Sequence, residues 1–125
     1  MADDAVTVAG VRSPLIDIGP RADEAAVFVH GNPGSRLDWA ELADAVSGFG
    51  RAVAMDMPGY RRAGKPANFD YTIAGYARHL AGALDQLDIS RAHLVLHDFG
   101  GPWGLAWAAG HRDQVTGDAH MRSKR

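Results

Sequence analysis

The chain has 125 residues, enough for one ordinary domain with one continuous hydrophobic core. Its 13 basic and 15 acidic residues give a net charge of −2, which argues against nucleic acid or an anionic membrane as a partner. The chain contains no cysteine, which excludes a disulfide framework and thiolate chemistry.

The first predicted elements are short strands. Residues 6–12 and 15–18 are two β-prone pieces separated by Ser13 and Pro14, and we interpret them as a hairpin or as two edge strands. Residues 25–30 form a continuous apolar run closed by a glycine-rich turn. Continuous rather than alternating apolarity favours a strand that is covered on both faces, as in a parallel sheet.

Two helices and a further strand follow. Ser35 and Asp38 have the spacing of a capping box, which predicts a helix start just after Ser35. Residues 51–55 are another short apolar strand. The clearest helix spans residues 72–87, because its apolar side chains recur at helical spacing and Thr72 can cap its first turn.

The last predicted elements are a strand and a helix joined by a tight turn. Residues 92–97 are apolar, Asp98 lies at the turn, and small residues continue as a helix over 101–109. Periodicity is lost after that helix. We therefore predict a domain over residues 1–112 and a disordered tail over residues 113–125.

This order of elements predicts the fold class. Strands that alternate with helices imply right-handed crossovers and an α/β fold with a mainly parallel sheet flanked by helices. Ligands in such folds bind beyond the carboxyl ends of the strands. The loops after His30 and His97 both follow predicted strands. We therefore expect these two loops to face one cleft.

Three motifs in these loops resemble a known family. They are His-Gly-Asn-Pro-Gly-Ser at 30–35, Asp-Met-Pro-Gly-Tyr at 56–60 and His-Asp-Phe-Gly-Gly at 97–101. Over roughly residues 27–112 the chain resembles the N-terminal half of an α/β-hydrolase, closest to the haloalkane dehalogenase and epoxide hydrolase branch. The resemblance implies an α/β-hydrolase core that is truncated after the nucleophile-elbow helix.

The resemblance implies that Asp98 is the nucleophile. In this fold the nucleophile lies on a strained turn between a strand and a helix, and Gly100 and Gly101 supply the space that such a turn needs. A carboxylate is ionised at neutral pH, so it can attack an sp³ carbon and form a covalent ester that water then hydrolyses. The alternative is that Asp98 only caps the following helix, since aspartate is a favoured N-cap.

The resemblance also assigns the oxyanion hole to the backbone N–H groups of Asn32 and Phe99. Pro33 has no N–H and cannot contribute. In the dehalogenase branch an Asn side chain at the position of Asn32 contacts the halide, together with a Trp indole directly after the nucleophile. Here Phe99 offers no such donor. Epoxide hydrolases use tyrosines of a cap domain instead, so the two substrate classes stay open.

Other polar residues receive supporting roles. We interpret His30 as a residue that holds its loop by a hydrogen bond, and His97 as an orienting residue whose side chain points away from Asp98. Asp56 has a structural role in the resembling family. The middle motif departs from the family pattern, because Arg61 stands where glycine is usual.

The triad acid and histidine come after the nucleophile in this fold. His111 and His120 fall in or just past the elbow helix, so neither is expected to reach Asp98 as a general base. We therefore expect a truncated or frameshifted gene product with impaired hydrolysis. The strand over 92–97 would become an exposed edge that favours self-association.

These features leave two hypotheses for function. The first is a hydrolase with an aspartate nucleophile that acts on small haloalkane- or epoxide-like molecules. The second is a non-catalytic fragment or interaction module. Neither needs a cofactor or a metal. The acidic N-terminus lacks the apolar segment of a secretory signal, so we expect a cytoplasmic location.

Overall fold

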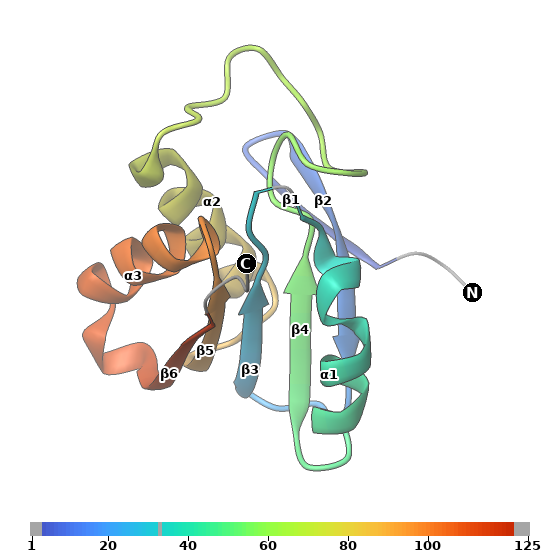
Figure 1. Ribbon diagram of the computed structural model, residues 1–125. Coiled ribbons are helices and arrows are strands. Elements are labelled where there is room, and N and C mark those ends of the chain that lie inside the picture. Colours follow the sequence, from blue (N-terminus) through green and yellow to red (C-terminus); the bar gives the residue numbers. More distant parts are fainter. Residues whose placement is uncertain (1–3, 33, 122–125) are drawn as a thin grey trace.

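The computed structural model describes residues 4–32 and 34–121, and of residues 117–121 it describes the backbone alone. In this part of the chain one sheet has the strand order β1-β2-β4-β3-β5-β6 (Figure 1). The four strands from β3 onward run parallel, and β2 joins them antiparallel through β4. This confirms the mainly parallel sheet flanked by helices. The strands are β1 (Ala5–Val8), β2 (Val11–Ile18), β3 (Glu24–Val29), β4 (Arg51–Met55), β5 (Arg91–His97) and β6 (Val115–Met121).

The N-terminal hairpin is formed by β1 and β2, which pair antiparallel. The predicted break at Ser13 and Pro14 is wrong, since β2 runs through both residues. Pro14 lies where β2 changes its partner: Pro14 pairs with Ala5 of β1, and Leu15 with Met55 of β4. At such a junction the missing N–H of proline removes no bond from the inner ladder.

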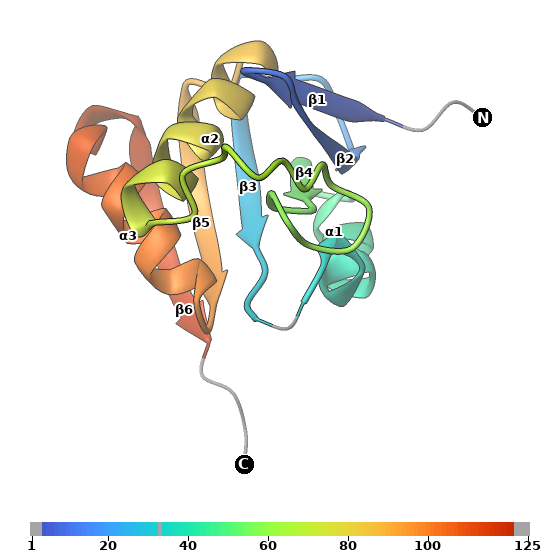
Figure 2. The ribbon, with the colours of Figure 1, turned by 90° about the horizontal axis from the view of Figure 1, so that it is seen from above.

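Helices cover both faces of the sheet (Figure 2). α2 (Ile73–Gln86) and α3 (Gly100–Gly110) pack on one face, and the short 3₁₀ turn η1 (Arg36–Trp39) and α1 (Ala40–Val46) lie on the other. The central strands β3 and β4 are therefore covered on both faces, which explains their continuous apolar runs. Among the described residues, no helix is long and apolar enough to cross a membrane.

Neighbouring residues of one strand belong to different cores. Val27 and Val29 of β3 lie in the core beneath α2 and α3. Phe28, between them, belongs to the smaller core beneath α1. All three are at most 2% exposed. The alternation of side chains along a strand thus serves two cores at once.

The predicted helix starts are confirmed. The Ser35 hydroxyl accepts the N–H of Leu37 and the Asp38 carboxylate accepts the N–H of Ser35, which completes the capping box. Thr72 caps α2 by accepting the N–H of Gly75. The predicted 72–87 helix corresponds to α2 together with its two cap residues.

The C-terminal segment differs from its prediction. Residues 115–121 form β6, which pairs parallel with β5, so the prediction of a disordered tail is wrong for them. For the same reason the prediction that β5 is an exposed edge is wrong, and β6 takes the outer position among the described strands. Residues 122–125 lie outside the described part. The domain boundary after residue 112 stays a prediction.

Candidate functional site

The turn between β5 and α3 is a strained elbow. β5 ends at His97, α3 begins at Gly100, and Asp98 between them has a φ of 54°. A non-glycine residue in this left-handed region is uncommon and costs free energy, so surrounding structure must hold it there. The predicted strand, turn and helix are confirmed. The role of Asp98 as a nucleophile stays a prediction.

The loop after β3 approaches the elbow closely. The backbone N–H of Asn32 donates to Oδ2 of Asp98 at 3.1 Å. A Cβ on Gly31 would lie 2.5 Å from Cβ of Asp98, and a Cβ on Gly100 would lie 2.4 Å from the carbonyl oxygen of Val29. Only glycine fits at either position. The expected space at Gly100 is confirmed, and Gly31 is a second requirement that the sequence alone did not indicate.

His30 joins two loops of the site. Its Nδ1–H donates to the carbonyl oxygen of Gly31 at 2.8 Å, and its Nε2 accepts the backbone N–H of Met57 at 3.0 Å. The ring is fully buried, and this burial lowers the pKa of His30. A neutral imidazole whose two nitrogens both form hydrogen bonds with the backbone has a structural role. The interpretation of His30 as a residue that holds its loop is confirmed.

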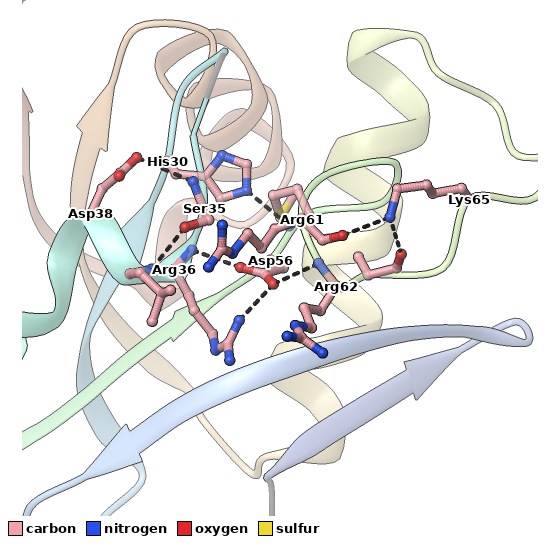
Figure 3. Close-up of polar contacts among 11 residues, drawn as sticks. His30, Ser35, Arg36, Asp38, Asp56, Arg61, Arg62 and Lys65 are labelled. Carbon is pink, nitrogen blue, oxygen red and sulfur yellow. Dashed lines mark hydrogen bonds and ion pairs between the residues drawn. The ribbon is translucent and has the colours of Figure 1, made fainter.

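Asp56 is a second residue that connects two loops by hydrogen bonds (Figure 3). Its carboxylate accepts the backbone N–H of Arg36 at 2.8 Å, the Arg36 guanidinium at 2.6 Å and the backbone N–H of Arg62 at 3.2 Å. Asp56 is 0% exposed. A buried carboxylate that is paired and hydrogen-bonded in this way ties the loop after β4 to the turn η1. Its structural role agrees with the family pattern.

The residues next to Asp98 have different surroundings. The His97 ring lies 6.3 Å from the ring of Trp39, which belongs to the core beneath α1. Phe99 is 52% exposed, directly after Asp98. The backbone N–H of Asn32 donates to Asp98, and Asn32 is an exposed residue. The oxyanion-hole roles of Asn32 and Phe99, and the halide contact of the Asn32 side chain, stay predictions.

An aromatic cluster lies next to this site, in the core beneath α2 and α3. Tyr76 of α2 stacks on Trp103 of α3 with ring centroids 4.2 Å apart. Tyr60 lies 5.0 Å from the His30 ring and 5.7 Å from Trp103. Tyr76 and Trp103 are core residues. Tyr60 is the aromatic residue of the middle motif, and its sequence context did not indicate this position.

The histidines after Asp98 were not expected to act as its base. His111 follows α3 at the end opposite Asp98. Its Nδ1–H donates to the carbonyl oxygen of Trp107 at 2.7 Å, and the two rings stack at 5.0 Å. His111 therefore terminates α3. The side chain of His120 lies outside the described residues.

Comparisons with known proteins agree with this geometry. The family profile of the alpha/beta hydrolase fold matches residues 26–123. A haloalkane dehalogenase of Mycolicibacterium smegmatis is 41% identical over 106 residues, which cover 80% of this chain and 33% of that protein. The chain thus spans about a third of that curated relative.

Solved structures give the same result. The haloalkane dehalogenase DatA from Agrobacterium tumefaciens C58 matches 95% of this chain with a TM-score of 0.85 and 33% identity, over 40% of its own length. The epoxide hydrolase VrEH1 from Vigna radiata matches 95% with a TM-score of 0.86 and 26% identity, over 39% of its length. The chain therefore belongs to the alpha/beta hydrolase fold family, and it is similar to the haloalkane dehalogenases and epoxide hydrolases that its three motifs predicted.

Proposed function

We propose that this chain carries the nucleophilic part of an α/β-hydrolase acting on haloalkane- or epoxide-like small molecules. The observation that carries the proposal is the position of Asp98: a half-buried carboxylate on a strained elbow, with one oxygen bound by the backbone N–H of Asn32. A helix-capping role, the alternative, does not require the close approach at Gly31. Strain of this kind gathers where function needs a side chain in one place.

The first step is alkylation. Oδ1 of Asp98 forms a bond to the sp³ carbon while the carbon–halogen bond breaks, and the halide leaves with the electron pair of that bond. With an epoxide the ring carbon–oxygen bond breaks, and the resulting alkoxide must take up a proton. The Asn32 side chain, exposed at the same loop, is the proposed halide contact.

The second step is hydrolysis of the ester. Oδ2 of Asp98 is then the ester carbonyl oxygen, and water attack places negative charge on it. The N–H of Asn32 already points at this atom, and we assign the N–H of Phe99 as the second donor. Two donors at the developing oxyanion would stabilise this step.

We propose that hydrolysis is impaired in the chain as it stands, because it needs a base that deprotonates water. Both ring nitrogens of His30 hold backbone partners, and His111 lies at the far end of α3. Neither of these two histidines is placed to act on a water at Asp98. The covalent ester should then accumulate rather than turn over.

Mass spectrometry of the whole chain tests this function. The chain is incubated with 1-bromobutane or with 1,2-epoxybutane, and the modified residue is located by peptide mapping, with Asp98→Asn as the control. We expect one adduct per chain, on Asp98, and none on the control. Steady release of alcohol would show that a base is present. A chain that stays unmodified would favour the non-catalytic fragment.

Self-association remains a second, structural proposal. Among the described strands, β6 occupies the outer position of the sheet, so its unpaired edge is where a second copy could add a strand. Light scattering over a concentration series tests it. A mass that stays that of one chain at every concentration would contradict the proposal.

A further inference from the structure

The ring of Tyr60 lies between His30, which precedes the loop that contacts Asp98, and Trp103 of α3, the helix that follows Asp98. Its backbone N–H donates to the carbonyl oxygen of Met57 at 3.0 Å, directly after Gly59, whose φ is 87°. This turn directs the ring against His30, which precedes the loop of Asn32, and against Trp103 of α3. The ring is therefore held by packing beside the elbow.

The hydroxyl of Tyr60 differs from those of the other two tyrosines. The Tyr71 hydroxyl donates to the carbonyl oxygen of Pro66 at 2.8 Å, and the Tyr76 hydroxyl donates to that of Pro58 at 2.8 Å. Within residues 4–32 and 34–121, the Tyr60 hydroxyl has no hydrogen-bond acceptor. Tyr60 is half-buried, and its ring is held between the rings of His30 and Trp103.

Electrostatics agree with this placement. Burial, and then the negative charge of Asp98, raise the pKa of Tyr60 above its ordinary value. The phenol thus keeps its proton throughout the neutral range. A phenol that stays protonated is a hydrogen-bond donor.

Alkylation of Asp98 creates a need for such a donor. Negative charge develops on the leaving atom, and the residue directly after the nucleophile, Phe99, has no N–H or O–H in its side chain. We propose that the Tyr60 hydroxyl donates a hydrogen bond to the leaving group while Asp98 is alkylated. This inference rests on the proposed function of Asp98.

The step balances for both substrate classes. With a haloalkane the halide departs with the bonding electron pair and accepts a hydrogen bond from the Tyr60 O–H, which keeps its proton. With an epoxide the ring oxygen takes the phenolic proton as the carbon–oxygen bond breaks, and the Tyr60 phenolate recovers a proton from water. Tyr60 would then be the acid that the epoxide reaction requires.

The test compares Tyr60→Phe with a matched control, Tyr71→Phe, in the whole chain. Each variant is incubated with 1,2-epoxybutane, 1-bromobutane and 1-iodobutane, and the rate of adduct formation on Asp98 is followed by mass. Loss of one hydrogen bond to a developing charge should slow alkylation about tenfold or more in Tyr60→Phe. Tyr71→Phe should react at the parent rate.

The order of the three probes separates a donor from a structural residue. The slowing should be largest for the epoxide oxygen, smaller for bromide and smallest for iodide, the weakest acceptor. Equal slowing for all three probes, or parent rates in Tyr60→Phe, would overturn the role of Tyr60 while the function of Asp98 stands. If the parent chain forms no adduct with any probe, the proposed function itself fails, and the role of Tyr60 fails with it.

Discussion

Two aspartates at the same edge of the sheet have opposite surroundings. Asp56 follows β4, is 0% exposed, and accepts the Arg36 guanidinium and two backbone N–H groups. Asp98 follows β5, is half-buried, and is held at a φ of 54° with Asn32 as a backbone donor. Both are carboxylates on loops after parallel strands, so neither residue type nor position in the fold distinguishes them.

The difference shows what makes a carboxylate structural. The guanidinium of Arg36 neutralises the charge of Asp56, and burial keeps substrates away from it. At Asp98 the structure instead holds the residue in a costly backbone conformation, close to a loop that carries an N–H donor. We therefore expect changes at Asp56 to affect stability and changes at Asp98 to affect reactivity.

The largest effect is expected at the nucleophile. Asp98→Asn should abolish alkylation by 1-bromobutane, because a neutral amide oxygen does not replace an ionised carboxylate. The fold should remain, since the amide oxygen can still accept the N–H of Asn32. Mass spectrometry measures the adduct, and circular dichroism checks the fold. An adduct that still forms at its original position would contradict the assignment.

Asp56→Asn tests whether the buried ion pair of Asp56 stabilises the fold. Breaking a buried ion pair leaves the Arg36 guanidinium without its anion, so the free energy of unfolding should fall by about 3 kcal/mol. Urea denaturation measures it. In the control, Asp70→Asn, the exposed pair with Arg78 is lost, and the change should be much smaller because solvent screens this pair. Equal effects of the two variants would contradict the special role of Asp56.

Acid should weaken the fold at a site distant from Asp98. His79 of α2 is 2% exposed, its Nε2 lies 2.8 Å from Oγ of Ser13, and burial lowers the pKa of His79 to about 4. The unfolded chain, with an ordinary histidine, takes up the proton first as the pH falls. Stability present above pH 6.5 is therefore lost between pH 6.5 and 4, by roughly 3 kcal/mol.

Urea denaturation across this range, with His79→Gln as the control, measures the effect. The control should show a shallower pH dependence. Parallel curves for the parent and the control would mean that His79 does not cause the acid sensitivity. Such a result would assign the acid sensitivity to other titratable groups, and stability could then no longer be treated as independent of the surroundings of Asp98.

The smallest effect is expected from backbone strain in the middle motif. Arg61 has a φ of 48°, so Arg61→Gly should raise the free energy of unfolding by about 0.5 kcal/mol. In the control, Arg62→Gly, the residue is outside the left-handed region, and the change should destabilise by about 0.5–1 kcal/mol. Thermal unfolding compares them. If both variants are destabilised, the contacts of the Arg61 side chain stabilise the fold by more than its left-handed backbone conformation destabilises it.

Much of the fold could be predicted because its signals are local. The continuous apolar runs predicted buried parallel strands, and the caps at Ser35 and Thr72 predicted where helices begin. The failures involved residues whose state depends on a partner. β6 is a strand because β5 lies beside it, and Pro14 is tolerated because β2 changes partners there.

The sequence by itself determined the family, the order of the elements and the position of Asp98, because three motifs and the apolar periodicity are visible in one chain. Only the tertiary structure decided which aspartate is neutralised, which glycines permit the close approach at the elbow, and that Tyr60 lies between His30 and Trp103. Those facts depend on distances between segments far apart in the chain. No local pattern encodes such distances, since packing sets them.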